Sequence, residues 1–232
     1  MNNLNGNNKM YDVRLQCPFT CIVSGASNTG KTTFIFNLLR SKDVLFTKMP
    51  SKTLLFYKKH QDVYDQMIEA GLVDELVFIK GDMISESDFE RKVSKYRNSG
   101  GSLCVFDDLL EAIDETNSKI FTKISHHENC NVIFLTQSLF VDNKHYRTMS
   151  KNATYMVLMK NPRNMSQIKN LSSQMCSEKS LLVKAYKDAT RAAYSYLFID
   201  FHPRTPEHIR LRSHILPDQG PMKVYLDSNG VC

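Results

Sequence analysis

The sequence predicts an α/β fold in which a mainly parallel central sheet is flanked by helices and followed by a small C-terminal extension. Strand-like apolar runs alternate with amphipathic helix-like segments, which is typical of parallel sheets whose strands are joined by helices. A glycine-containing segment, residues 25–33, also lies directly between the first strand-like run and the first helix-like segment. The 232 residues are enough for one such domain with its own hydrophobic core.

The elements can be assigned in chain order from their apolar periodicity and their end signals. Strands of the core sheet are expected at residues 19–24, 53–57, 76–79, 103–106, 131–136 and 154–159. Helices are expected at residues 34–40, 62–70, 85–96, 114–127 and 168–186. Gly71 ends the second helix, and the third opens with Ser85 and carries acidic residues early and basic residues late, as the helix dipole favours.

Composition divides the chain into one domain and two short tails. Residues 1–12 are polar and rich in Asn, which predicts a disordered tail. Residues 13–217 are expected to form the domain, including an extension from about residue 165 with strands at 194–199 and 209–215, and residues 218–232 form a weakly patterned tail. Since no apolar run has the length of a membrane span and no secretory signal is present, we expect neither a membrane span nor secretion.

The glycine-containing segment has the spacing of a phosphate-binding loop, two glycines four residues apart followed by Lys and a hydroxyl residue. Gly25 and Gly30 allow a turn in which backbone N–H groups point at phosphate oxygens. Lys31 supplies a charge for the β- and γ-phosphates, and Thr32 supplies a hydroxyl for Mg²⁺. We therefore expect ATP and Mg²⁺ as ligands, with the phosphates held by Gly25, Ala26, Ser27, Asn28, Thr29, Gly30, Lys31, Thr32 and Thr33.

A second signature follows the strand at 103–106, where Asp107 and Asp108 come directly after four apolar residues. Ligands of open α/β sheets bind at this carboxyl end of the strands. Asp107 is predicted to hold Mg²⁺ together with Thr32, and Asp108 to polarise the water that attacks the γ-phosphate. The alternative interpretation is that these carboxylates cap the following helix.

Gln137 follows the strand at 131–136, and its side chain could hydrogen-bond the γ-phosphate or the attacking water. Arg147 and Arg163 lie on either side of the last core strand, and either could stabilise transition-state charge in a neighbouring subunit. The alternative interpretations are a surface Gln and arginines that are solvated or contact DNA phosphate. Arg147 is the preferred candidate for this arginine finger.

The type of nucleotide-binding protein can be narrowed further. A strand at 53–57 comes between the loop strand and the acid strand, as in ATPases with an added central strand. Guanine recognition would need Asn-Lys-x-Asp, and the segment at residues 143–146 lacks the Asp. A kinase would need an acceptor pocket and an arginine-rich lid. A net charge of +6 permits a polyanionic partner.

The order of these motifs resembles the FtsK–HerA superfamily of genome-packaging ATPases. It is most similar to the poxvirus-type packaging ATPases of large double-stranded DNA viruses, virophages, Maverick/Polinton elements and adintoviruses. The resemblance covers residues from about 17 to about 217. It rests on residues 25–33, Phe56 and Tyr57 with Gln61 and Tyr64, residues 105–108, residues 127–137, residues 152–163, and the C-terminal segments 188–190 and 196–200.

The resemblance implies a RecA-like fold and a homo-oligomeric ring, hexameric or pentameric, that translocates double-stranded DNA into a preformed capsid by hydrolysing ATP. It implies capsid or portal-vertex proteins as partners. It also implies that the protein acts inside the host cell, at a nuclear or cytoplasmic assembly site. Association with the virion is a further expectation. Members often carry Glu at the position of Asp108, so the shorter Asp leaves its role as base open. Another DNA-translocating or helicase-like ATPase is the alternative, ahead of a small-molecule kinase or a non-hydrolysing switch.

Overall fold

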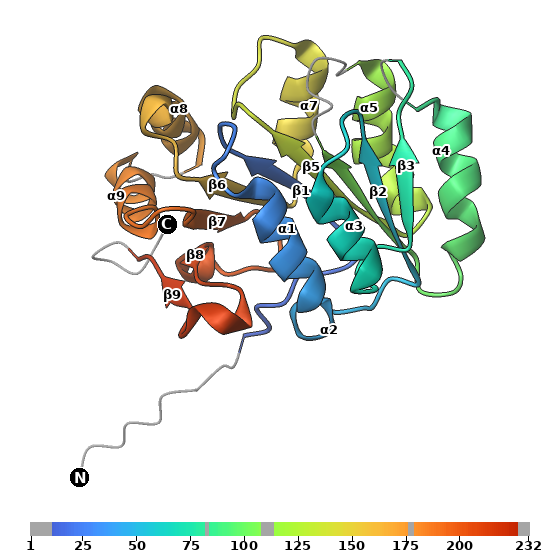
Figure 1. Ribbon diagram of the computed structural model, residues 1–232. Helices are drawn as coiled ribbons and strands as arrows, with labels where there is room; N and C mark the ends of the chain where they lie inside the picture. The colour runs from blue at the N-terminus through green and yellow to red at the C-terminus, as the bar shows by residue number, and fades with distance from the viewer. Residues whose placement is uncertain (1–10, 82–83, 108–113, 176–178, 227–232) are drawn as a thin grey trace.

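A computed structural model describes residues 11–81, 84–107, 114–175 and 179–226 of the chain. Its strands form one sheet in the order β3-β2-β4-β5-β1-β6-β7-β8-β9 (Figure 1). The strands are β1 (Thr20–Ser24), β2 (Lys52–Tyr57), β3 (Glu75–Phe78), β4 (Ser102–Asp107), β5 (Cys130–Thr136), β6 (Tyr155–Met159), β7 (Tyr196–Asp200), β8 (Leu211–Ser213) and β9 (Lys223–Val224). The neighbouring strands from β3 to β6 pair in parallel, and β7, β8 and β9 add antiparallel pairs. The mainly parallel sheet predicted from the sequence is therefore confirmed.

Helices cover both faces of this sheet. They are α1 (Lys31–Arg40), α2 (Lys42–Leu45), α3 (Asp62–Glu69), α4 (Glu86–Val93), α5 (Glu115–Lys119), α6 (Ser125–His127), α7 (Lys144–Asn152), α8 (Met165–Met175) and α9 (Lys179–Ala189). A π-helical stretch, η3 (Ile120–Ile124), joins α5 to α6, and short 3₁₀ turns lie at η1 (Ser94–Tyr96), η4 (Pro162–Asn164), η5 (Glu207–Ile209) and η6 (Pro217–Gln219). Figure 1 shows α1 and α3 side by side on the near face.

The core lies in two layers because successive side chains of a strand point to opposite faces. In β5, Val132 and Phe134 belong to one buried cluster, together with side chains of α4, η3, α7, α8 and α9. Ile133 and Leu135 belong to the other, together with side chains of α1 and α3. All seven residues of β5 are buried, as expected for a strand covered on both faces.

Three elements differ from the expectation. The single helix expected at 168–186 is two helices, α8 and α9, which pack against each other. Both bury apolar side chains in the same cluster, Leu171 from α8 and Leu182 from α9, which one straight helix could not place over the same part of the sheet. Helix α7 was not expected, although its start is encoded locally: the Asn143 side chain accepts hydrogen bonds from the backbone N–H groups of His145 and Tyr146. β9 lies in the segment assigned to a tail.

The predicted position of the added strand in the sheet was wrong. β5 separates the loop strand β1 from the acid strand β4, whereas β2 lies on the far side of β4. Strand order follows from pairing between distant segments, which a strand-like run does not reveal. The consequence is that the carboxyl end of β5, and with it Gln137, lies between the loop and Asp107.

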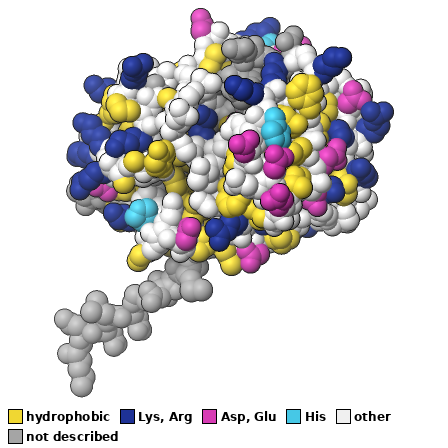
Figure 2. All heavy atoms as spheres, in the orientation of Figure 1, with side chains coloured by type: hydrophobic (Ala, Val, Ile, Leu, Met, Phe, Trp, Pro, Cys, Tyr) yellow, Lys and Arg dark blue, Asp and Glu magenta, His cyan; other side chains and the backbone are white. Residues whose placement is uncertain are grey.

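Charges are unevenly distributed over the surface. The charged residues of α3, Asp62 and Asp65 among them, are all acidic. Helix α9 is rich in lysine, including Lys184 and Lys187, and α8 adds Lys169. Figure 2 shows Lys and Arg side chains gathered along the α8–α9 side of this face and acidic side chains near α3. Among the described helices, none combines the length and apolar character that a bilayer crossing requires.

Candidate functional site

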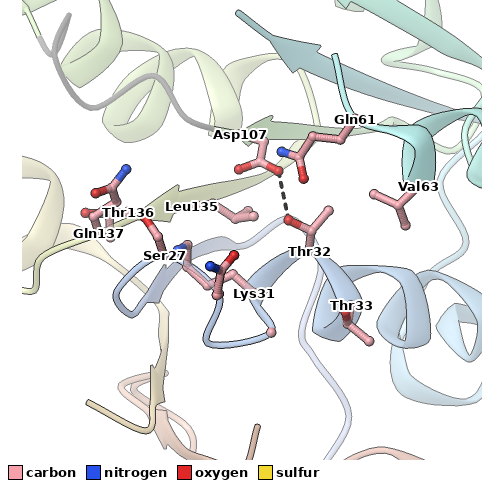
Figure 3. Close-up of a pocket in the computed structure, with 12 residues that line it drawn as sticks. Ser27, Lys31, Thr32, Thr33, Gln61, Val63, Asp107, Leu135, Thr136 and Gln137 are labelled. Carbon is pink, nitrogen blue, oxygen red and sulfur yellow. Dashed lines mark hydrogen bonds between the residues drawn. The ribbon is translucent and has the colours of Figure 1, made fainter. Parts of the chain in front are cut away.

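A pocket of about 350 Å³ opens at the carboxyl ends of β1, β4 and β5. Figure 3 shows its side chains around one opening, with Gln137 on one side and Gln61 on the other. Its lining residues are Ser27, Asn28, Gly30, Lys31, Thr32, Thr33, Gln61, Val63, Asp107, Leu135, Thr136 and Gln137. The structure thus brings together most of the residues that sequence patterns singled out, from segments far apart in the chain.

The loop's glycines are required by its geometry. The Gly25 N–H donates to the Thr136 carbonyl, 3.0 Å away, which ties the loop to the end of β5. A Cβ at Gly25 would lie 2.6 Å from the Cβ of Met159, closer than side chains pack. Gly30 has a φ of 90°, in the left-handed region that favours glycine. Of the expected phosphate ligands, Gly25, Ala26 and Thr29 form the base of the loop and do not line the pocket; the Thr29 hydroxyl donates to the Ala26 carbonyl.

Lys31 is half-buried at the start of α1. Its Nζ donates to the carbonyl oxygens of Gly25, at 2.8 Å, and Ala26, at 3.0 Å. Among the described residues, no side chain caps the N-terminus of α1, so the helix presents backbone N–H groups and the positive end of its dipole to the pocket. A phosphate at this place would meet an ammonium group and a helix N-terminus together, which is a strong anion site.

Asp107 is the centre of a hydrogen-bonded chain. Its Oδ2 accepts from the Thr32 hydroxyl, at 3.1 Å, and from the Tyr64 phenol, at 2.9 Å. The Gln61 Nε2 in turn donates to the Tyr64 hydroxyl, at 2.7 Å. Asp107 and Tyr64 are both buried. The sequence resemblance included Tyr64 but gave it no role, because its contact joins α3 to β4 and depends on the fold.

The donor set at Asp107 fits Mg²⁺. Thr32 and Asp107 offer a hydroxyl and a carboxylate oxygen side by side, and magnesium prefers oxygen ligands while keeping several waters or phosphate oxygens. The described residues contain no cluster of three or more His, Cys, Asp or Glu side chains that would form a self-contained metal cage. A cation here would therefore be shared between these two residues and a bound phosphate.

The segment that follows Gln137 is held by two helices. The Tyr146 phenol of α7 donates to the Ser138 carbonyl, at 3.0 Å. The Gln167 side chain of α8 accepts from the Leu139 N–H, at 3.2 Å, and donates to the Ser138 hydroxyl, at 3.1 Å. Gln167 and Tyr146 were missed by sequence reasoning, since their contacts depend on how α7 and α8 pack. They fix the direction in which the chain leaves β5.

Two predicted residues, Arg147 and Arg163, lie outside this pocket. Arg147 is exposed on α7, and its guanidinium lies 3.4 Å from the exposed carboxylate of Asp142. Arg163 is exposed in η4. Neither lines the phosphate pocket of this chain. Asp108, the predicted catalytic acid, lies outside the described residues.

We expect Tyr64→Phe to destabilise the protein by about 1–3 kcal/mol, because it removes a hydrogen bond to a buried carboxylate. Chemical denaturation measures the change in the free energy of unfolding. Tyr57→Phe is the matched control: Tyr57 packs against Tyr64, with ring centroids 5.4 Å apart. Within the described residues, its hydroxyl has no hydrogen-bond partner. Equal losses in the two variants would show that the bond to Asp107 contributes nothing.

No protein-family model matches the chain, and no curated protein matches it. Solved structures do match. One is the genome packaging NTPase B204 from Sulfolobus turreted icosahedral virus 2 in complex with ATP-gammaS. It is 13% identical, with a TM-score of 0.49, and the alignment covers 89% of this chain and 96% of that one. At this identity and TM-score the likeness adds nothing to the functional argument, which rests on the pocket.

Proposed function

We propose that this chain is an ATP-hydrolysing motor that moves double-stranded DNA into a preformed viral capsid. The observation that carries the hydrolytic part is the single pocket in which Lys31, the Thr32–Asp107 pair and Gln137 converge. Each supplies a different requirement of phosphoryl transfer: positive charge, a cation site and a polar group beside the reacting phosphate.

The residues divide the chemistry between them. Lys31 binds the β- and γ-phosphates once its ammonium leaves the loop carbonyls. Thr32 and Asp107 would hold Mg²⁺, which would supply positive charge against the phosphates. Gln137 orients the attacking water or senses the γ-phosphate, and we propose Asp108 as the group that polarises this water.

The motor part of the proposal is supported by sequence resemblance and by charge. The side of the molecule on which Lys169 of α8 and the lysines of α9 lie suits a polyanion, because contacts with DNA phosphates need no base-reading motif (Figure 2). We propose a hexameric or pentameric ring that docks on capsid or portal-vertex proteins at an assembly site inside the host cell.

In such a ring, Arg147 would reach the pocket of a neighbouring subunit, with Arg163 as the alternative. Its exposure supports a role in trans, since it is available to a neighbour. Mixing Arg147→Ala with Lys31→Ala subunits measures this: recovered hydrolysis supports the role in trans, and no recovery at any ratio counts against it.

A different DNA-translocating or helicase-like ATPase would share this pocket and is the second candidate. The position of β5 between β1 and β4 favours either ATPase over a nucleoside kinase, because it brings Gln137 beside the phosphates. A nucleotide switch without turnover would not need the water-polarising acid proposed at Asp108.

The test is ATP hydrolysis by the full chain with Mg²⁺, with and without long double-stranded DNA. We expect DNA to stimulate turnover, and EDTA to abolish it. Single-stranded DNA of the same mass is the matched comparison, because a helicase-like enzyme would respond to it at least as strongly. Turnover that ignores DNA and requires a nucleoside acceptor would contradict the motor and favour a kinase.

A further inference from the structure

A second hollow of about 300 Å³ adjoins the phosphate pocket across the start of α1. The two share Gly30 and Thr33 in their linings. The far wall of the second hollow comes from the C-terminal extension, whose purpose the sequence does not explain. A ligand whose phosphates lie in the first pocket could therefore extend its other end into the second.

Tyr194 stands at the boundary of the two pockets. It is 69% exposed although it is a large aromatic residue. Its Cδ1 atom is 3.2 Å from the position that a Cβ on Gly30 would take, so its side chain lies directly against the phosphate loop. The turn is held at this edge of the sheet by the Lys160 N–H, which donates to the Ser195 carbonyl at 3.1 Å.

The backbone of this pocket is also strained. Tyr194 has a φ of 58° and His214, which also lines the hollow, has a φ of 56°. Residues with a Cβ rarely adopt this region, and such strain collects at ligand clamps. Since the Tyr194 ring is mostly exposed, its burial contributes little to offset this conformation.

The polar groups of the hollow include two neutral amides, those of Asn37 and Gln219, beside hydroxyl groups and the His214 imidazole. Asn37 lies one helical turn after Thr33, on the same face of α1, and its side chain has no hydrogen-bond partner among the described residues. Gln219 accepts a hydrogen bond from the Tyr196 hydroxyl through Oε1, and its amide nitrogen has no partner within the described chain. No Asp, Glu, Lys or Arg of the described residues lines the hollow.

We propose that this hollow binds the adenine ring of the ATP whose phosphates bind residues 25–33, an inference that rests on the proposed function. Tyr194 stacks on the base, because an exposed aromatic ring offers its face to any purine. The Asn37 amide, a donor and an acceptor together, matches the N6 donor and N7 acceptor of adenine. Guanine presents two acceptors there and is read by Arg or Lys, which this lining lacks.

The assignment gives the C-terminal extension a specific task. The turn that carries Tyr194 leads into β7, and the segment that carries His214 and Gln219 follows β8. The antiparallel strands thus hold the base-binding wall against α1, while the parallel strands hold the phosphate-binding side. Base selectivity and phosphate chemistry come from different parts of the sheet.

The experiment compares ATP, GTP and inorganic tripolyphosphate, each with Mg²⁺, by calorimetric titration into the full chain. The variants are Tyr194→Asn, Tyr194→Phe and Asn37→Ala. Asn tolerates the left-handed backbone at position 194, so the ring is removed without adding strain. We expect Tyr194→Asn to weaken ATP binding by on the order of tenfold and to leave tripolyphosphate binding unchanged. Tyr194→Phe should bind ATP as the wild type does, and Asn37→Ala should reduce the preference for ATP over GTP.

The outcomes separate this inference from the proposed function. Equal affinity of the wild type for ATP and tripolyphosphate, or equal weakening of both by Tyr194→Asn, would overturn the base site while phosphate binding stands. GTP bound as tightly as ATP would overturn the assignment to adenine. A wild-type chain that binds neither ATP nor tripolyphosphate would overturn the proposed function and this inference with it.

Discussion

Lys31→Ala is expected to lower kcat for ATP hydrolysis by on the order of 10²- to 10³-fold, the loss that follows removal of one preorganised group that stabilises charge in a transition state. The Lys31 ammonium is half-buried, where its charge is screened less than at the surface. Its hydrogen bonds to the Gly25 and Ala26 carbonyls hold it at the mouth of the loop. Steady-state turnover with saturating Mg²⁺ measures the effect.

Lys151→Ala is the matched control, because Lys151 is an exposed lysine at the end of α7 and lies outside the pocket. It should hydrolyse ATP at the wild-type rate. Both variants should unfold at similar denaturant concentrations, since Lys31 is not a member of either buried apolar cluster. A Lys31→Ala protein with wild-type turnover would show that another pocket performs the hydrolysis.

The phosphate side of the site was predictable because its requirements are local. A loop around phosphate needs glycine where a Cβ would collide, and Gly25 and Gly30 occupy those places. A charge and a hydroxyl then follow at fixed spacing, and the helix begins at Lys31. The buried strands were equally predictable, since a strand covered on both faces must be apolar throughout.

The rest depends on contacts between distant segments. Tyr64 reaches Asp107 because α3 packs over β4, and Gln167 reaches the segment after Gln137 because the fold places α8 beside that segment. Tyr194 lies against Gly30 because β7 pairs with β6. A linear pattern contains no record of such neighbours. The same limit applies to the added strand: β5, and not the strand-like run at 53–57, lies between β1 and β4.

A buried ion pair holds the C-terminal extension together. The Arg212 guanidinium on β8 binds the Asp200 carboxylate on β7, and both residues are buried. Arg212 also donates to the Val13 carbonyl, at 2.8 Å, and lies 4.9 Å from the centre of the Phe198 ring. Burial lowers the pKa of Arg212, and the Asp200 charge opposes that shift.

Asp200→Asn is expected to destabilise the protein by about 3–5 kcal/mol, because it leaves the Arg212 charge buried without its counter-ion. Chemical denaturation measures the loss. Asp12→Asn is the matched control: Asp12 pairs with Arg14, 2.8 Å away, at the surface. Since exposed pairs contribute at most about 1 kcal/mol, the control should change stability little. Equal effects of the two substitutions would contradict a special role for burial.

The double variant Asp200→Leu with Arg212→Met tests the cause. If the loss comes from an unpaired buried charge, replacing both partners with apolar side chains should recover much of the stability.

β8 leads directly into the segment that carries His214 and Gln219, so the ion pair also supports the wall of the second pocket. Asp200→Asn should therefore weaken ATP binding more than tripolyphosphate binding even where the protein is still folded, because the phosphate loop is anchored to β5 and β1 rather than to the extension.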